Sequence, residues 1–333
     1  MIDFVVTWVD GADPAWQAKR ARFQPGGGED AGVARYRDWG LLRYWFRAVE
    51  AFAPWVRRVY LVTDGQCPPW LNRGHPALVL ADHRDFIPEQ YLPAFSANPI
   101  ELNLHRLEGL AEQFVFFNDD MFLIRPVQPE DFFRGGLPVD DALLSPVIVS
   151  KRGDVGSIAL NDMCLINSHF QKNQVIRAAP GKWFCPKYGA MLLRTLCLMP
   201  WRHFPGFYND HLPQPFLKSS YEEVWRLEGE VLDQVCTHRF RDYQRDLNQW
   251  LIRYWQFAQN RFVPASPGRG RDLDILREDA AGHIRGRKTK MICINDSDRI
   301  LNFEQVRSGV EEAFRQLLPE RSAFEIAQEE ENA

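Results

Sequence analysis

Three adjacent polar side chains interrupt an apolar run and offer this chain its clearest chance of chemistry. Residues 114–117 are strand-like, Asn118, Asp119 and Asp120 follow, and residues 121–123 are apolar again. Charged side chains are rarely buried unless they are paired or bind a metal. We therefore expect the acids where a central strand reaches a cleft, where a carboxylate pair suits Mg²⁺ and a phosphate-bearing substrate. A solvated turn between two strands is the alternative.

The N-terminal strand leads into a second candidate loop. Residues 2–9 are mostly β-branched or aromatic, and they deliver Trp8, Asp10 and Gly11 into a turn. Such a loop suits a nucleotide, because Trp stacks, Gly permits close backbone approach and Asp contacts a ribose or a metal. An ordinary strand-to-helix turn explains the same residues.

Two further strand-like segments, residues 59–63 and 291–294, also end in polar residues. These residues are Asp64, Gly65, Asn295 and Asp296. If the strands are parallel neighbours, their acids converge at one edge of the sheet. That convergence would indicate a site better than any single acid does.

Histidine and arginine candidates lie in the second half of the chain. His211 is followed by Pro213 and Pro215, which stiffen its segment, as suits a general base or a phosphate ligand. His238 and Arg241 follow a predicted helix, and guanidinium groups match phosphate oxygens. A surface histidine and ordinary ion pairs are the alternatives.

A helix is predicted over residues 100–112. Its apolar stripe faces the core, and Glu101, His105, Glu108 and Glu112 share another face at helical spacing. A solvated face is the usual meaning of such a pattern, although the helix leads directly into the strand that carries the acids.

Composition restricts the class of protein. The 333 residues favour one large α/β domain with an insertion, or two closely packed lobes. A net charge of −4 does not suit a nucleic-acid binder. No run approaches the ~18 apolar residues of a membrane span, and no signal-peptide pattern is seen, so we expect a cytoplasmic protein. Six scattered cysteines predict reduced core thiols and no zinc site.

The order of elements predicts three parts. Residues 1–150 alternate strands and helices, with a helix at 39–52 and a last strand at 143–149. Residues 151–285 form a mostly helical lobe, with helices near 158–178, 188–198, 220–236 and 243–262. Residues 286–333 return a strand and a helix, 302–317, to the core. The loop at residues 24–34 is rich in glycine but lacks the glycine spacing of a phosphate-binding loop. Residues 328–333 are polar and are predicted to form a frayed tail.

Read together, these motifs resemble the Stealth family of sugar-1-phosphate transferases. That family includes bacterial capsular polysaccharide phosphotransferases and the GlcNAc-1-phosphotransferase that tags lysosomal enzymes. Four blocks carry the resemblance in order: residues 2–11, residues 42–122, the stretch from His211 to Arg241, and residues 292–296.

The resemblance implies an α/β fold similar to nucleotide-sugar transferases, with a Rossmann-like or GT-A-like sheet and a mostly helical lobe. It implies transfer of a sugar 1-phosphate from a UDP-sugar, such as UDP-GlcNAc, to a hydroxyl of a glycan acceptor. The products are a phosphodiester and UMP, as in capsular or exopolysaccharide synthesis.

The resemblance also implies roles for single residues. Asp119 or Asp120, together with Asp296, would hold Mg²⁺ or Mn²⁺, while His211 and Arg241 would be catalytic along with Asp120. The nucleotide-sugar would be bordered by Trp8, Asp10, Gly11, Asp64, Gly65 and Asn118. Further possible substrate contacts are Glu101, His105, Arg106, His238 and Asn295.

Two other functions fit part of the sequence. A metal-dependent glycosyltransferase that releases UDP would use the same acids and aromatics, although His211 and Arg241 favour phosphoryl transfer. A non-catalytic glycan- or nucleotide-binding module would be expected to have lost the acids or the histidine. The sugar donor, the acceptor, the choice between Asp119 and Asp120 as metal ligand, and the oligomeric state are left open by the sequence.

Overall fold

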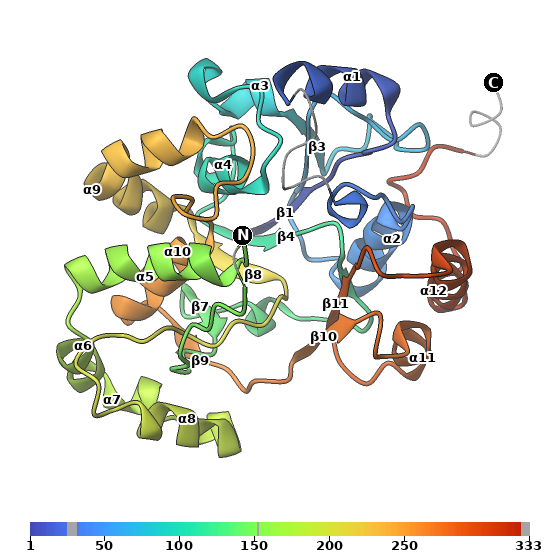
Figure 1. Ribbon diagram of the computed structural model, residues 1–333. Coiled ribbons are helices and arrows are strands. Elements are labelled where there is room, and N and C mark those ends of the chain that lie inside the picture. The colour runs from blue at the N-terminus through green and yellow to red at the C-terminus, as the bar shows by residue number, and fades with distance from the viewer. Residues whose placement is uncertain (25–31, 152, 328–333) are drawn as a thin grey trace.

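A computed structural model describes residues 1–24, 32–151 and 153–327. The glycine triplet of the predicted loop and the polar tail from residue 328 lie outside the described residues. Figure 1 shows a mixed α/β molecule, with helices on both sides of a central sheet and a helical lobe to one side. The predicted α/β class with a mostly helical lobe is confirmed.

The central sheet contains four parallel strands and one antiparallel strand, in the order β3-β2-β1-β4-β8. The strands are β1 (Ile2–Thr7), β2 (Val59–Thr63), β3 (Leu78–Asp82), β4 (Gln113–Phe117) and β8 (Gln214–Leu217). In β4, Val115 and Phe117 pack into one core, while Phe114 and Phe116 pack into a second core. The apolar run is therefore explained by burial on both faces of the sheet.

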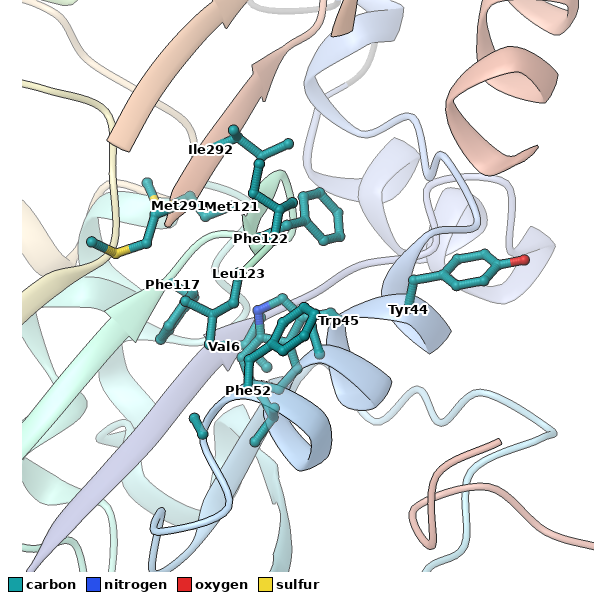
Figure 2. Packing of buried hydrophobic residues seen from close by; sticks show 14 of the residues in the cluster. Val6, Tyr44, Trp45, Phe52, Phe117, Met121, Phe122, Leu123, Met291 and Ile292 are labelled. Carbon is teal, nitrogen blue, oxygen red and sulfur yellow. The ribbon is translucent and has the colours of Figure 1, made fainter. Parts of the chain in front are cut away.

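A second sheet lies beyond the end of β4. It comprises β10 (Gly270–Asp274), β11 (Met291–Asn295) and β5 (Met121–Leu123), with β5 antiparallel to β11. Figure 2 shows Phe122 and Ile292 of this sheet near Trp45 of α2 (Leu42–Phe52) and Phe117 of β4. One core thus joins the two sheets and fixes the turn between β4 and β5.

The remaining elements surround these sheets. A small third sheet contains β6 (Phe133–Arg134), β7 (Leu137–Asp140) and β9 (Val263–Pro264). The outer helices are α1 (Pro14–Phe23), α3 (His83–Phe86), α4 (Ala97–Leu102), α11 (Ala280–Gly286) and α12 (Phe303–Leu317). Short 3-10 helices span Val33–Arg35, Glu89–Tyr91, Leu104–Arg106, Pro129–Asp131 and Pro186–Met191.

The helical lobe contains α5 (Gly156–His169), α6 (Lys172–Ala178), α7 (Pro180–Trp183), α8 (Leu192–Cys197), α9 (Lys218–Cys236) and α10 (Trp250–Ala258). Residues 151–285 also supply β8 to the central sheet and contain β9 and β10, so the lobe is interwoven with the core. The predicted division at residues 150 and 285 stays a prediction. Within the described residues, no helix combines the length and apolar character needed to cross a membrane.

Several predicted elements are wrong. The helix expected over residues 100–112 is divided, because α4 ends at Leu102 and a separate 3-10 turn spans Leu104–Arg106. The Asn103 side chain donates to the Pro99 carbonyl, and Gly109 has a φ of 70°, so the chain turns towards β4. The acids at 101, 108 and 112 therefore do not share one helical face.

Other differences are smaller. Residues 143–149 form no strand beyond a single bridge from Leu144 to Phe207. The helix predicted from residue 243 begins only at Trp250, because Asp242 and Asp246 form hydrogen-bonded turns before it. All six cysteines are free, but only two are core residues, and Cys164 and Cys197 are exposed.

Candidate active site

A cavity of about 1170 Å³ opens at the carboxyl ends of the parallel strands. Trp8 after β1, Asp64 after β2 and the 118–120 turn after β4 all line it. Because β2, β1 and β4 are adjacent and parallel, their ends meet at one edge of the sheet, as predicted. The helical lobe closes the other side with His211 and Arg241.

The turn at residues 118–120 links the two sheets. Met121 donates its backbone N–H to the Asn118 carbonyl at 3.1 Å, which closes the turn. Ile294 of β11 donates its backbone N–H to the Asp120 carbonyl at 2.9 Å. The acidic residues are thus held rigidly between β4 and the strand that carries Asn295.

The two half-buried carboxylates of this turn have no cationic partner among the described residues other than His211. Burial, together with the nearby carboxylates of Asp120, Asp38 and Asp296, raises the pKa of Asp119 well above its usual value. The Oδ1 atom of Asp120 is buried without a hydrogen-bond partner. A hard cation would relieve both conditions, so these two side chains fit Mg²⁺ or Mn²⁺.

His211 contacts this turn directly. Its Nε2 atom lies 3.3 Å from Asn118 Nδ2 and 3.7 Å from Asp120 Oδ2. Burial opposes charge on the imidazole, but Asp120, Asp272 and Glu101 outweigh it and raise the pKa of His211. If Asn118 donates to Nε2, that atom carries the lone pair of the neutral ring and faces the cavity acids.

A buried cysteine, Cys293, lies close to Asp120 and His211. Asp120, His211 and Cys293 each offer a ligand atom, and these atoms lie within 4.8 Å of one another. Burial, with Asp120 and Asp272 nearby, raises the pKa of the Cys293 thiol well above its usual value. A protonated thiol is a poor ligand, so the carboxylates and not the sulfur favour a cation here.

Glu101 and Arg241 both line the cavity and interact electrostatically with each other. Burial raises the pKa of Glu101, while Arg241, the Gln249 backbone and His211 oppose that shift. Glu101 Oε2 and Arg241 Nε are both buried without hydrogen-bond partners. Both side chains line the cavity, so each retains an atom able to bind a substrate group.

Asp296 lines the cavity but is already paired. Arg37 donates through Nε to Oδ2 at 2.8 Å and through Nη2 to Oδ1 at 2.5 Å, and Trp39 Nε1 donates to Oδ2 at 3.0 Å. Its role as a metal ligand stays a prediction, and it requires Asp296 to exchange this bidentate partner for the ion.

Asp10 and Gly11 after β1 and Asp64 after β2, all predicted to border the nucleotide, lie at different cavities. Asp10 and Gly11 line an adjoining cavity of about 730 Å³. A side chain at Gly11 would lie 2.0 Å from the Tyr36 carbonyl oxygen, so only glycine fits there. Asp64 lies in the main cavity and pairs with Lys19 at 2.5 Å. Gly65 has a φ of 75° and forms the turn after β2.

Four residues predicted to contact the substrate, Gly65, His105, Arg106 and His238, do not line either cavity in the described parts of the chain. His105 is buried with its ring 5.8 Å from those of Tyr221 and Trp225, and Arg106 lies 4.7 Å from the Trp225 ring. His238 Nδ1 lies 2.7 Å from Asp246 Oδ1. Each of these three side chains has a partner within the fold, and contact with substrate stays a prediction for all four residues.

Some lining residues carried no clear sequence signal. Arg37 and Trp39 are remote from Asp296 in sequence, and nothing local reveals their pairing. Asp272 bonds to Asn295 because β10 and β11 are parallel neighbours. Nothing in the local sequence around Asp272 marks it as a residue of the cavity.

Three family models match the chain. Stealth conserved region 1 matches residues 2–28, conserved region 2 matches residues 35–138 and conserved region 4 matches residues 282–333. In fold, the chain aligns with a galactosyltransferase LgtC solved with donor and acceptor sugar analogs, at 11% identity over 98% of each chain with a TM-score of 0.42.

Similar curated proteins extend along almost the whole chain. Receptor polysaccharide phosphotransferase WefC of Streptococcus oralis is 45% identical, covering 98% of this chain and 99% of its own. Capsular polysaccharide phosphotransferase WcwK of Streptococcus pneumoniae is 40% identical, covering 97% and 98%. Exopolysaccharide phosphotransferase cps2G of Lactiplantibacillus plantarum is 41% identical, covering 97% and 96%. The chain therefore belongs to the Stealth protein family, and these relatives are polysaccharide phosphotransferases.

Proposed function

We propose that this protein transfers a sugar 1-phosphate from a UDP-sugar to a hydroxyl group of a glycan acceptor, with release of UMP. The observation that carries this proposal is one cavity in which Asp119 and Asp120 face His211 and Arg241. Phosphoryl transfer depends mainly on positioning and charge neutralisation, which this set of side chains supplies. The names of the curated relatives support the same class of reaction.

The reaction replaces one phosphorus–oxygen bond with another. The acceptor oxygen forms a bond to the β-phosphorus, and the bond from that phosphorus to the bridging oxygen breaks, so UMP departs. His211 Nε2 takes the proton of the acceptor hydroxyl. Asp120 Oδ2, at 3.7 Å from Nε2, stabilises the imidazolium that results, and Asn118 gives up its contact with Nε2 once that atom carries the proton.

Arg241 is placed to bind phosphate oxygens. Its Nε is buried without a hydrogen-bond partner, and Glu101 interacts with it electrostatically. Held by Asp119 and Asp120, Mg²⁺ or Mn²⁺ would neutralise charge on the pyrophosphate. Trp8 and Asp64, at the ends of β1 and β2, would border the nucleotide.

The identity of the released nucleotide tests this proposal. The protein is incubated with UDP-GlcNAc or other UDP-hexoses, Mg²⁺ and candidate glycans, and nucleotides are separated by chromatography. We expect UMP together with a phosphodiester product, and loss of both in the His211→Gln variant.

Other outcomes would overturn the proposal. Release of UDP would indicate attack at the anomeric carbon and a conventional glycosyltransferase. Donor binding without turnover across the whole donor panel would indicate a binding module.

A further inference from the structure

One segment of the helical lobe has an unusual charge. Residues 163–209 contain no Asp or Glu, although the chain has 44 acids among 333 residues and a net charge of −4. The same stretch contains six cationic side chains: Lys172, Arg177, Lys182, Lys187, Arg194 and Arg202. This segment, which contains the second half of α5 and all of α6, α7 and α8, is therefore strongly basic within an acidic protein.

The same segment exposes large apolar side chains. Leu193 is 64% exposed and Leu196 is 49% exposed; three residues apart on α8, they share one face. Trp201, in the turn after α8, is 56% exposed. Thr195 points the opposite way, where its buried hydroxyl accepts from the Leu144 backbone N–H. The exposed face is thus fixed by the packing of α8 on the body of the protein.

The exposed cations of this segment are not neutralised. Among the residues that the structure describes, Arg177, Lys187 and Arg202 make no ion pair. Arg194 lies 5.4 Å from the Tyr208 ring and pairs with no acid in the same part of the chain. Their charges therefore remain available to an anionic partner outside the fold.

The position of the segment suits an outside contact. Figure 1 shows α6, α7 and α8 at the lower left edge of the molecule, on the opposite side from α11 and α12. The active-site cavity is lined from the other parts of the lobe, and residues 156–207 contribute nothing to its described lining. Contact at this edge would leave the cavity accessible.

We propose that five exposed side chains of this segment, here called the basic apolar surface, dock on an anionic lipid bilayer: Lys187, Leu193, Leu196, Trp201 and Arg202. Leu and Trp side chains beside Lys and Arg are the composition of segments that lie in a membrane interface. The cations would bind lipid phosphates while the apolar side chains enter the headgroup boundary. A second copy of the chain fits less well, because self-association would bring two unpaired basic surfaces together.

Vesicle flotation of the full chain tests this proposal. We expect binding to vesicles of mixed phosphatidylglycerol and phosphatidylcholine, little binding to phosphatidylcholine alone, and weaker binding at high salt. The double variant Lys187→Glu/Arg202→Glu should bind at least roughly tenfold less, since each cation at an anionic surface contributes roughly a fivefold factor. Trp201→Ser should also lower binding roughly tenfold by removing apolar contact.

A matched control separates this surface from general charge and hydrophobicity. The double variant Arg285→Glu/Leu301→Ser changes one exposed cation and one exposed leucine outside the segment, and it should bind as the parent does. UMP release in solution should be unchanged in every variant, which also shows that each one folds.

Three results would overturn the proposal: equal binding to neutral vesicles, equal loss in the control variant, or no vesicle binding at all. Concentration-dependent self-association that Trp201→Ser abolishes, without vesicle binding, would assign the surface to a second copy instead.

Discussion

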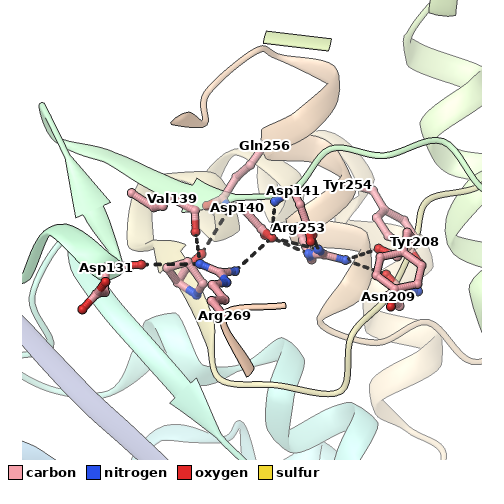
Figure 3. Close-up of polar contacts among 11 residues, drawn as sticks. Asp131, Val139, Asp140, Asp141, Tyr208, Asn209, Arg253, Tyr254, Gln256 and Arg269 are labelled. Carbon is pink, nitrogen blue, oxygen red and sulfur yellow. Dashed lines mark hydrogen bonds and ion pairs between the residues drawn. The ribbon is translucent and has the colours of Figure 1, made fainter. Parts of the chain in front are cut away.

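Two pairs of adjacent aspartates lie in this protein, and their surroundings differ. Asp140 and Asp141, at the end of β7, are enclosed by arginines (Figure 3). Arg253 donates through Nε and Nη2 to Asp140 at 2.8 Å each, and through Nη2 to Asp141 at 2.9 Å. Arg269 adds a contact to Asp140 at 3.2 Å. Both side chains are buried, and both are paired with arginine.

Asp119 and Asp120 have no such partners. No ion pair to Asp119 is found in the described parts of the chain, and Asp120 has only His211 at 3.7 Å. Both line an open cavity. Buried charge that is paired with arginine maintains the fold, whereas crowded charge left unpaired beside a cavity indicates a binding site. One Asp-Asp pair thus maintains the fold, and the other indicates a binding site.

The largest effect is expected where the paired cluster is broken. Arg253→Met leaves Asp140 and Asp141 buried without their main partner, which should lower the free energy of unfolding by about 3–5 kcal/mol. Denaturant titration measures this change. Activity per folded molecule should stay near that of the parent, and a selective loss of turnover would instead place this cluster in the catalytic machinery.

The unpaired cluster should show the reverse behaviour. Asp120→Asn removes a charge that faces the cavity, and it should lower the rate of UMP release on the order of 10²–10³-fold. The unfolding midpoint should change little, because no cationic partner other than His211 is left behind. A large loss of stability with normal turnover would contradict the comparison.

The pH dependence of stability should separate Asp119 from Asp140, one member of each pair. The pKa of Asp119 is raised by burial above its ordinary 3.8, so its protonated form is favoured in the folded state and parent stability falls as pH rises above that value. Asp119→Asn removes this penalty, and its stability gain over the parent should grow with pH. Added Mg²⁺ should reduce the difference in stability between this variant and the parent. Thermal unfolding at several pH values measures both stabilities.

The pH dependence of stability expected from Asp140 is the reverse of that expected from Asp119. Burial favours its neutral form, but Arg253 outweighs this and lowers the pKa of Asp140. Its charged form therefore stabilises the fold above the ordinary pKa of the group, and that stability is lost as pH falls. Asp140→Asn should destabilise most at neutral pH. Parallel pH curves for the two Asn variants would remove the distinction between the pairs.

The smallest effect concerns Asp296, which lies between these extremes. It lines the cavity and yet is paired with Arg37. If it also binds the metal, Arg37→Gln removes a competing cation from its carboxylate and should tighten Mg²⁺ binding roughly tenfold. Calorimetric titration measures this affinity. Weaker or unchanged binding would assign the pair to the support of the cavity wall.

The amino-acid sequence alone determined the strands of the central sheet and the acids that follow them. Residues 2–7, 59–63 and 113–117 are mostly β-branched or aromatic. Burial of such residues on both faces of a sheet strongly favours a strand. The family blocks also follow from local sequence, and three of them were matched by family models.

Only the tertiary structure decided which acidic side chains have arginine partners. Asp140 meets Arg253 across 113 residues of chain, and Asp296 meets Arg37 across 259. Local sequence does not show that Asp140 has an arginine partner and that Asp119 has none among the described residues. The state of a carboxylate depends on burial and on the charges that folding brings within reach, and these contacts are set by long-range packing that local patterns do not encode.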